Sequence, residues 1–193
     1  MQDPGALAFR PDVAAMLLWE ALERACGIRE SAWRTPILST VSPEGGPQAR
    51  IVVMRAADSA TRLLEFHSDS RSAKLKAIAL EPRVELCFWD SAAQLQLRAS
   101  GVAAISADSA RRESAWARVP IDSRKNYSGE SRPGPICCDP NPEAVHEEDG
   151  FANYAILDVE LCRLEWLWLG ATPHSRGQMV WEGGAWHAGP LMP

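Results

Sequence analysis

The sequence predicts a mainly β fold with flanking helices, in which an antiparallel sheet forms a barrel. Several short segments alternate apolar and polar residues or are rich in β-branched residues, as strands are. Turn sequences rich in Gly, Pro, Asp and Ser separate most of them, which favours hairpin connections. Six or seven predicted strands and two helices at the rim therefore indicate an antiparallel barrel.

Length and charge limit the class of protein. A chain of 193 residues fits a single domain, 1–193, with an N-terminal arm and helix in 1–30 and a long irregular loop in 120–150. Apolar residues make up 46% and charged residues 23%, which is ordinary for a globular protein. The net charge of −5 argues against the basic surface that non-specific nucleic-acid binding requires.

The five cysteines and the apolar runs predict a cytoplasmic protein. The cysteine count is odd and includes no CxxC pair, which fits a reducing compartment and no disulfide framework. The chain opens with MQDPGALAFR, which has no signal-peptide pattern, and no apolar run is long enough to span a bilayer. We therefore expect no membrane association.

Residues 1–11 read as a loose arm, followed by an amphipathic helix that Asp12 caps and Gly27 ends. Glu20, Glu23 and Arg24 would face water. The predicted apolar stripe packs against the body of the fold and comprises Val13, Met16, Leu17, Leu22 and Cys26, with Trp19 beside it.

The next segments predict an antiparallel meander of three strands. TPILSTVS (35–42) is the first strand, and PEGG (43–46) is a turn into a strand that Arg50 and Arg55 bracket. The four apolar residues between the arginines predict a strand packed on both faces. After the turn AADSAT, residues 62–67 form the third strand.

A helix over 70–80, with Asp69 or Ser70 as its cap, precedes two alternating strands. RVELCFWD (83–90) places Val84, Leu86 and Phe88 on one face. QLQLRASGVAAIS (94–106) places Gln94, Gln96 and Arg98 on one face, and Gly101 indicates a bulge or bend.

The C-terminal part predicts a short helix, the long loop and more strands. Asp108 or Ser109 caps the helix of 108–118, and the Pro-, Gly- and acid-rich segment 120–150 follows. Phe151–Leu169 is one bent strand or two strands. The tail is a hairpin with Glu182-Gly183-Gly184 at its turn.

SDSRSAK (68–74) has the chemistry of a phosphate site. The start of a helix carries unpaired N–H groups and a partial positive charge, and here hydroxyls accompany Arg71 and Lys74. The alternative is that the arginines lie at strand ends in water and the serines only cap a helix.

Several ordered motifs resemble one family. RIVVMR (50–55), FHSDSRSAK (66–74), FWD (88–90), QLQLRASG (94–101) and EWLWLGATPHSR (165–176) resemble the pyridoxamine 5′-phosphate oxidase-like FMN-binding proteins, in the oxidase-related branch rather than the vitamin B6 enzyme. The resemblance implies a split β-barrel that binds FMN at the interface of a homodimer.

The resemblance also implies the cofactor-binding residues. Arg50 and Lys74 would contact the FMN phosphate, the backbone of 51–54 would lie along the ring, and Arg55 would lie near its reactive face. Gln96 would reach the ring edge from the partner subunit. The whole set is Arg50, Ile51, Val52, Val53, Met54, Arg55, His67, Ser68, Ser72, Lys74, Gln96, Trp168 and Arg176, with Trp168 preferred over Trp166 as the aromatic residue beside the flavin.

The chain departs from the vitamin B6 oxidases where those enzymes bind the substrate's phosphate. Arg55 replaces a lysine, only Ser123 of the middle motif matches, and 172–174 keeps the histidine but loses the arginine. Losing such charge-assisted hydrogen bonds argues against oxidation of pyridoxamine phosphate.

Two further clusters have alternative interpretations. Arg118, Arg124 and Tyr127 form a second anion site or are surface residues. His146 with the acids 147–149, near Cys137 and Cys138, fits no tetrahedral metal site, and we predict no metal.

The functional prediction is an FMN-dependent oxidoreductase that acts on an unidentified small molecule by hydride transfer to the flavin. The alternative is a non-catalytic binding module that holds FMN, haem or another planar ligand. A paralogue with no ligand is a third interpretation.

Overall fold

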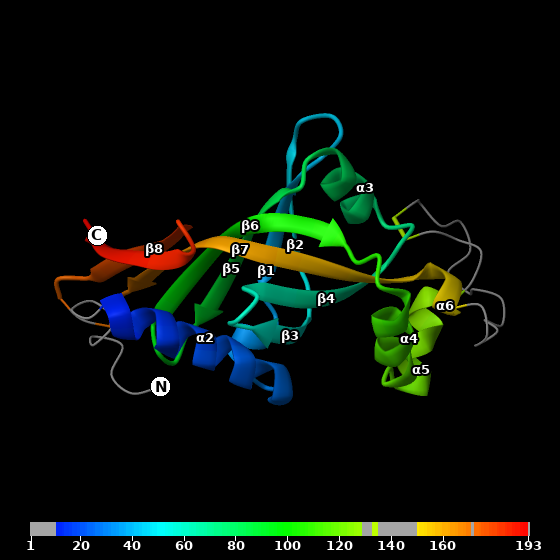
Figure 1. Ribbon diagram of the computed structural model, residues 1–193, viewed down its shortest axis with the longest axis horizontal. Helices are drawn as coiled ribbons and strands as arrows, with labels where there is room; N and C mark the ends of the chain where they lie inside the picture. Colours follow the sequence, from blue (N-terminus) through cyan, green and yellow to red (C-terminus); the bar gives the residue numbers. More distant parts are fainter. Residues whose placement is uncertain (1–10, 129–132, 135–149, 171, 193) are drawn as a thin grey trace.

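The computed structural model describes residues 11–128, 133–134, 150–170 and 172–192 (Figure 1). The predicted arm, most of the 120–150 loop and the cluster around His146 therefore lie outside the described residues.

Nine antiparallel strands form one sheet in the described part of the chain. The order along the sheet is β2-β1-β5-β6-β7-β4-β3. In the β8–β9 hairpin, β8 pairs with the C-terminal part of β7. The bounds are β1 Ile37–Val41, β2 Pro47–Ile51, β3 Met54–Asp58, β4 Leu63–Asp69, β5 Arg83–Asp90, β6 Leu95–Ile105, β7 Tyr154–Trp168, β8 Ser175–Glu182 and β9 Ala185–Leu191.

The sheet is a split barrel because its two edge strands are adjacent in the chain. β2 and β3 end the strand order on opposite sides, yet only Val52 and Val53 connect them. A link this short spans about 10 Å, so the sheet must curl until its edges approach each other. The edges do not pair, and the barrel stays open at this seam.

Two predictions about this region are wrong. Residues 50–55 are not one strand packed on both faces, since the chain changes edges there and Ile51 is 70% exposed while Met54 is 0% exposed. The three segments are also not a meander, because β2 and β3 do not pair. Instead the backbone N–H of Val52 donates a hydrogen bond to the carbonyl of Pro36 at 3.0 Å.

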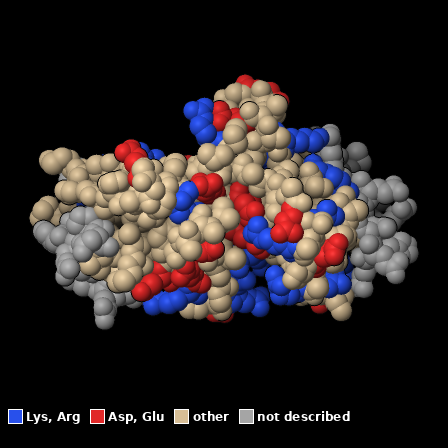
Figure 2. Space-filling view, in the orientation of Figure 1, with Lys and Arg blue, Asp and Glu red and all other residues tan. Residues whose placement is uncertain are grey.

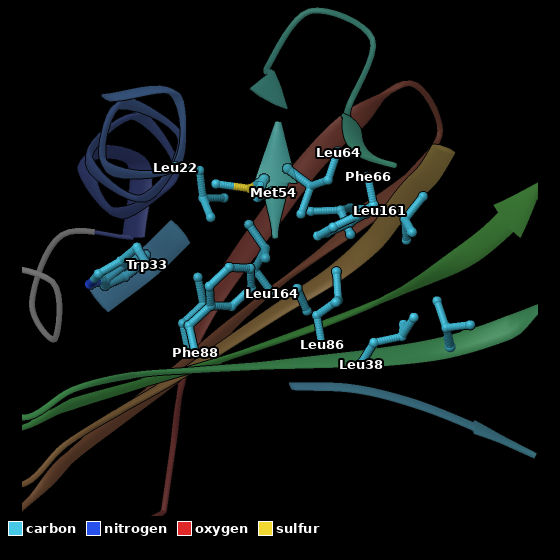
Figure 3. Packing of buried hydrophobic residues seen from close by; sticks show 14 of the residues in the cluster. Leu22, Trp33, Leu38, Met54, Leu64, Phe66, Leu86, Phe88, Leu161 and Leu164 are labelled. Carbon is cyan, nitrogen blue, oxygen red and sulfur yellow. The ribbon is translucent and has the colours of Figure 1, made fainter. Parts of the chain in front are cut away.

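The inner face of the sheet and the helix α2 (Pro11–Gly27) enclose the core (Figures 1 and 3). Val84, Leu86 and Phe88 point inward as predicted. Each fully buried side chain of this size contributes about 1.5–3 kcal/mol. Those that Figure 3 labels come from both sides of the barrel: Leu22, Trp33, Leu38, Met54, Leu64, Phe66, Leu86, Phe88, Leu161 and Leu164.

The helix α2 buries part of the predicted stripe, since Leu22 and Trp19 are in the core and Leu17 and Cys26 pack against it. Met16 is 55% exposed, and the helix starts at Pro11 rather than after a cap at Asp12. The residues that pack inward are spaced by three and four positions: Ala14, Leu18, Trp19, Leu22 and Ala25. The short helix η1 (Ala32–Arg34) adds Trp33, whose indole N–H donates to Asp90 Oδ2 at 3.3 Å.

The N-cap of the helix α3 (Ala73–Leu80) is Ser72, so the predicted caps Asp69 and Ser70 are wrong. Asp69 ends β4, and its Oδ1 accepts hydrogen bonds from the backbone N–H and Nε of Arg71 at 2.8 and 3.0 Å. This local pairing, between residues two positions apart, engages the carboxylate that was predicted to cap the helix.

Shorter helices cover one end of β7 (Figure 1). Asp108 caps α4 (Ser109–Ala117) as predicted, by accepting from the N–H of Arg111. α5 (Ile121–Arg124) and η2 (Lys125–Tyr127) follow, so the start of the 120–150 segment is helical and not an irregular loop. α6 (Gly150–Asn153) leads into β7, a single strand of 15 residues.

Two glycine predictions are confirmed. The register of β6 against β7 shifts between Ser100 and Gly101, which is the predicted bulge. The β8–β9 turn has Gly183 and Gly184 at φ values of +58° and +85°, where side chains are strained. No helix in the described residues is long and apolar enough to cross a membrane.

Candidate functional site

Arg50 and Lys74 form a basic site beside the start of α3. Nη1 of Arg50 donates to the carbonyl of Leu38 at 3.1 Å and to Oγ1 of Thr40 at 2.8 Å, which holds the guanidinium against β1. Nζ of Lys74 donates to Oγ of Ser72 at 3.3 Å, at the N-cap of α3. Strand β2 thus supplies one cation and the first turn of α3 the other.

Two buried hydroxyls accompany the cations. Oγ of Ser68 lies 3.2 Å from Oγ of Ser72, and both side chains are buried. The N-cap hydroxyl of Ser72 accepts no hydrogen bond from the α3 backbone. The helix start therefore keeps the N–H groups that suit an anion.

The charges of Arg50 and Lys74 are not compensated. In the described part of the chain neither side chain forms an ion pair with a carboxylate. Burial lowers the pKa of Lys74, and the nearby charge of Arg50 lowers it further, although Asp69 opposes this. Burial also lowers the pKa of Arg50. A bound dianion would relieve both the burial cost and the mutual repulsion.

The backbone of 51–54 crosses the seam between the two sheet edges, next to Arg50. Arg55 follows on β3 and is exposed, and it makes no ion pair or hydrogen bond with another described residue. His67 lies on β4, where its Nε2 is 2.9 Å from Oε1 of Glu65. The predicted residues of β2, β3, β4 and α3 are thus grouped around the seam.

Gln96 and Arg176 lie on the other face of the sheet. Gln96 pairs with Leu167, which pairs with Arg176, so both side chains share the outer face. Arg50 pairs with Leu38, whose side chain is in the core. One protomer therefore does not bring Gln96 and Arg176 together with the basic site.

Trp168 lies on the inward face of β7, one residue away from the outward Leu167. Its ring packs against the core, and its Nε1 donates to the carbonyl of Ala93 at 3.1 Å. Trp166, two residues earlier, is fully buried.

Glu165 is an outer-face residue that the sequence analysis missed. It is 5% exposed and binds three guanidinium groups: Arg98 at 3.3 Å, Arg163 at 3.0 Å and Arg176 at 2.7 Å. Burial alone would raise the pKa of Glu165, but these arginines lower it. Arg176 is thus held in place by a carboxylate beneath it.

Arg111 attaches helix α4 to the sheet. Its guanidinium donates to both carboxylate oxygens of Asp158 at 2.7 Å, and its Nε donates to Glu65 Oε2 at 3.2 Å. Burial alone would raise the pKa of Glu65, but hydrogen bonds from His67 and Arg111 lower it to about 2. The hydrogen bonds to Asp158 raise the pKa of Arg111. This network holds α4 at a fixed place over β4 and β7.

A pocket of about 360 Å³ lies between the helices α4, α5 and η2 on one side and the β3–β4 hairpin on the other. Figure 2 shows basic and acidic side chains intermingled over this end of the molecule. The lining residues are Arg55, Ala56, Glu65, His67, Ala115, Arg118, Val119, Pro120, Ser123, Asn126 and Tyr127. Among the described residues, no group of three or more His, Cys, Asp or Glu side chains could hold a metal ion.

The fold and the basic site define a class of structure, a split barrel with two neighbouring cations at the start of α3. Residues 16–107 match the model of the family described as "Pyridoxamine 5′-phosphate oxidase, FMN-binding domain". This part of the chain is therefore similar to the FMN-binding domain of the pyridoxamine 5′-phosphate oxidase family, the family that the motifs predict. FMN is the cofactor of that domain.

Curated relatives match over part of their length. The chain is 38% identical over 101 residues to the pyridoxine/pyridoxamine 5′-phosphate oxidase of Granulibacter bethesdensis, which covers 50% of this chain and 46% of the relative. It is 37% identical over 86 residues to the protein of the same name from Thermobifida fusca, a match that covers 45% of this chain and 37% of the relative. The matches thus span less than half the length of these relatives.

Solved structures share the fold over most of the chain. A pyridoxamine 5′-phosphate oxidase-related, FMN binding protein from Nostoc punctiforme aligns with a TM-score of 0.75 at 24% identity, covering 92% of this chain and 96% of its own. PhzG from Burkholderia lata, in complex with tetrahydrophenazine-1-carboxylic acid, aligns with a TM-score of 0.71 at 14% identity, covering 94% and 92%. The predicted split barrel is therefore confirmed.

Proposed function

We propose that the protein is an FMN-dependent oxidoreductase that acts on a small molecule. The observation that carries the proposal is the pair of uncompensated cations, Arg50 and Lys74, at the start of α3. A phosphate dianion supplies the two negative charges that this pair lacks. When bound, FMN supplies the two-electron chemistry, accepting a hydride at its ring.

The residues of this chain would bind and position the cofactor. Arg50, Lys74 and Ser72 would hold the phosphate, with Ser68 supporting Ser72 through their hydroxyl contact. The seam backbone of 51–54 offers peptide groups to the edge of a planar ring. Arg55 and His67 would lie between the cofactor and the adjacent pocket, since both line that pocket.

We further propose that a second copy covers the outer face of the sheet. Exposed apolar side chains lie there in register, with Ile51 beside Ile37 and Trp89 beside Gln96. Covering such a patch is favourable at about 25 cal/mol per Å². In that dimer the partner's Gln96 and the partner's Arg176 would complete the cofactor site, which explains why one protomer separates them from Arg50.

The proposed substrate is not pyridoxamine phosphate, although the curated relatives are named for it. Their match covers less than half of their length, and Arg55 stands where the vitamin B6 enzymes have a lysine. A cytoplasmic location remains a prediction.

The test is FMN content. Arg50→Ala combined with Lys74→Ala removes two charged contacts worth about 1.5–3 kcal/mol each, so FMN affinity should fall by at least about a hundredfold. The matched control is Lys76→Ala, an exposed lysine on the same helix, which should retain FMN. Equal FMN affinity in the double variant and the control would refute the proposed phosphate site.

A second measurement separates the enzyme from the binding module. The purified protein should be yellow, and anaerobic NADH, NADPH or another electron donor should bleach it, with the colour returning in air. A protein that retains FMN but resists reduction by every donor tested would instead be a module that holds the cofactor without turnover.

A further inference from the structure

The pocket beside β3 and β4 contains two arginines that have no carboxylate partner among the described residues. Arg55 makes no ion pair within the described ranges, and Arg118 donates only to Oγ of Ser114, at 2.9 Å. Both guanidinium groups line the pocket together with the apolar side chains Ala115 and Val119. The pocket thus combines cationic groups with an apolar wall.

The remaining charged groups around the pocket pair with each other and carry one net negative charge. Glu65 is bound by His67 and Arg111, and Arg111 is shared with Asp158. Glu65 stays ionised at neutral pH because its pKa is about 2. Three guanidinium groups therefore face two carboxylates, which leaves one net positive charge around the pocket.

A buried hydroxyl without a partner lies next to these groups. Oη of Tyr154 is buried and forms no hydrogen bond in the described part of the chain. Burial raises the pKa of Tyr154, as do the neighbouring Tyr127 and Glu65, while Arg55 and Arg118 oppose the rise. Tyr154 does not itself line the pocket, but four residues that do line it are its electrostatic neighbours.

We propose that this pocket binds a small organic carboxylate with an apolar body, as the substrate class of the proposed oxidoreductase. The carboxylate is held between Arg55 and Arg118, and the apolar body lies along Ala115, Val119 and Pro120. That the ligand is a substrate rests on the proposed function. The ligand class itself rests on the pocket alone.

A monoanion fits this pocket better than a phosphate dianion. One negative charge neutralises the surplus, whereas a second would face the fixed charge of Glu65 without a partner. An amine would meet two unpaired arginines. The volume of about 360 Å³ lies in the lower part of the range for ligand pockets, which suits a molecule of one or two rings.

The experiment compares three probes that share one ring and differ in charge: benzoate, phenyl phosphate and benzylamine. Each is titrated into the FMN-loaded protein by calorimetry, and the visible flavin spectrum is recorded in parallel. Benzoate should bind at least about tenfold more tightly than either other probe. Phenyl phosphate binding as tightly as benzoate, or tighter, would overturn the inference, and so would equal binding of benzylamine.

Variants then test the pocket residues. Arg118→Gln should weaken benzoate binding at least about tenfold, and Arg118→Lys should restore part of it. The matched control is Arg29→Gln, an exposed arginine in the turn after α2 that does not line the pocket. Circular dichroism establishes that each variant is folded. Unchanged benzoate affinity in folded Arg118→Gln would contradict the placement of the carboxylate.

The two proposals fail separately. FMN retention without discrimination between the probes overturns the ligand class and leaves the oxidoreductase intact. Tight benzoate binding by calorimetry in a protein that refuses FMN supports the pocket chemistry and refutes the proposed function. A change in the flavin spectrum on benzoate binding would support both, because it places the ligand beside the ring.

Discussion

Replacing Glu65 with Gln should destabilise the protein by about 2–3 kcal/mol at pH 7. The side chain is 13% exposed and is bound by both His67 and Arg111. The fold lowers the pKa of Glu65 from 4.5 to about 2, a difference equivalent to about 3 kcal/mol when the carboxyl is ionised. Asp158 still satisfies Arg111 in the variant, which keeps the loss at the lower end.

The pH dependence follows from the direction of the shift. A carboxyl whose pKa is lowered by folding contributes its full stability above its unfolded pKa, here 4.5, and loses it as the pH falls through about 2. The wild type and Glu65→Gln should therefore differ most at pH 7 and converge in strong acid. For a chain of this size the neutral-pH difference corresponds to about 4–12 °C in Tm.

Urea unfolding followed by circular dichroism measures both variants across this pH range. Glu81→Gln is the matched control, because the pKa of Glu81 is also about 2 but its hydrogen bonds come from Arg83 at the surface. Solvent and salt screen such a pair, so its loss should leave the free energy of unfolding nearly unchanged. If both variants cost the same, burial of the Glu65–Arg111 network is not what gives it strength.

Three other predictions address the bulge, the cofactor site and the outer face. Gly101→Ala should destabilise by about 1–3 kcal/mol in urea unfolding, because a Cβ would lie 2.4 Å from the carbonyl oxygen of Glu160, whereas Gly189→Ala meets nothing within 4 Å. FMN affinity, measured by flavin fluorescence, should fall as the pH rises, and it should do so at a lower pH than that at which an ordinary lysine loses its proton, because burial and Arg50 lower the pKa of Lys74. Lys74→Gln should abolish that pH dependence. Ile51→Asp should raise the monomer fraction in light scattering without loss of secondary structure, and an unchanged mass would contradict the proposed interface.

Local patterns predicted the elements whose cause is local. Alternation identified β5 with Val84, Leu86 and Phe88 inward, and Asp108, one of the two predicted candidates, is the cap of α4. Gly101 marked the bulge of β6. The family motifs around Arg50 and Lys74 also predicted a basic site, and the structure shows both cations without carboxylate partners in the described residues.

Features that depend on distant pairing were missed. The apolar run between Arg50 and Arg55 resembles a buried strand, but the change of sheet edges there depends on strands far along the chain. The Glu65–Arg111–Asp158 network joins three segments separated by more than 40 residues each, and none has a recognisable local pattern. The predicted cap at Asp69 is wrong for a local reason, since its carboxylate pairs with Arg71, two residues further along the chain.

The two-residue link between β2 and β3 holds the two edges of the sheet close together. Lengthening the chain at Val52 or Val53 would let the two edges move apart, and their peptide groups, which do not pair across the seam, would become more accessible to a foreign strand. An insertion at this position would therefore threaten solubility as well as cofactor retention, whereas an equal insertion in the β8–β9 turn would extend a hairpin tip and do neither.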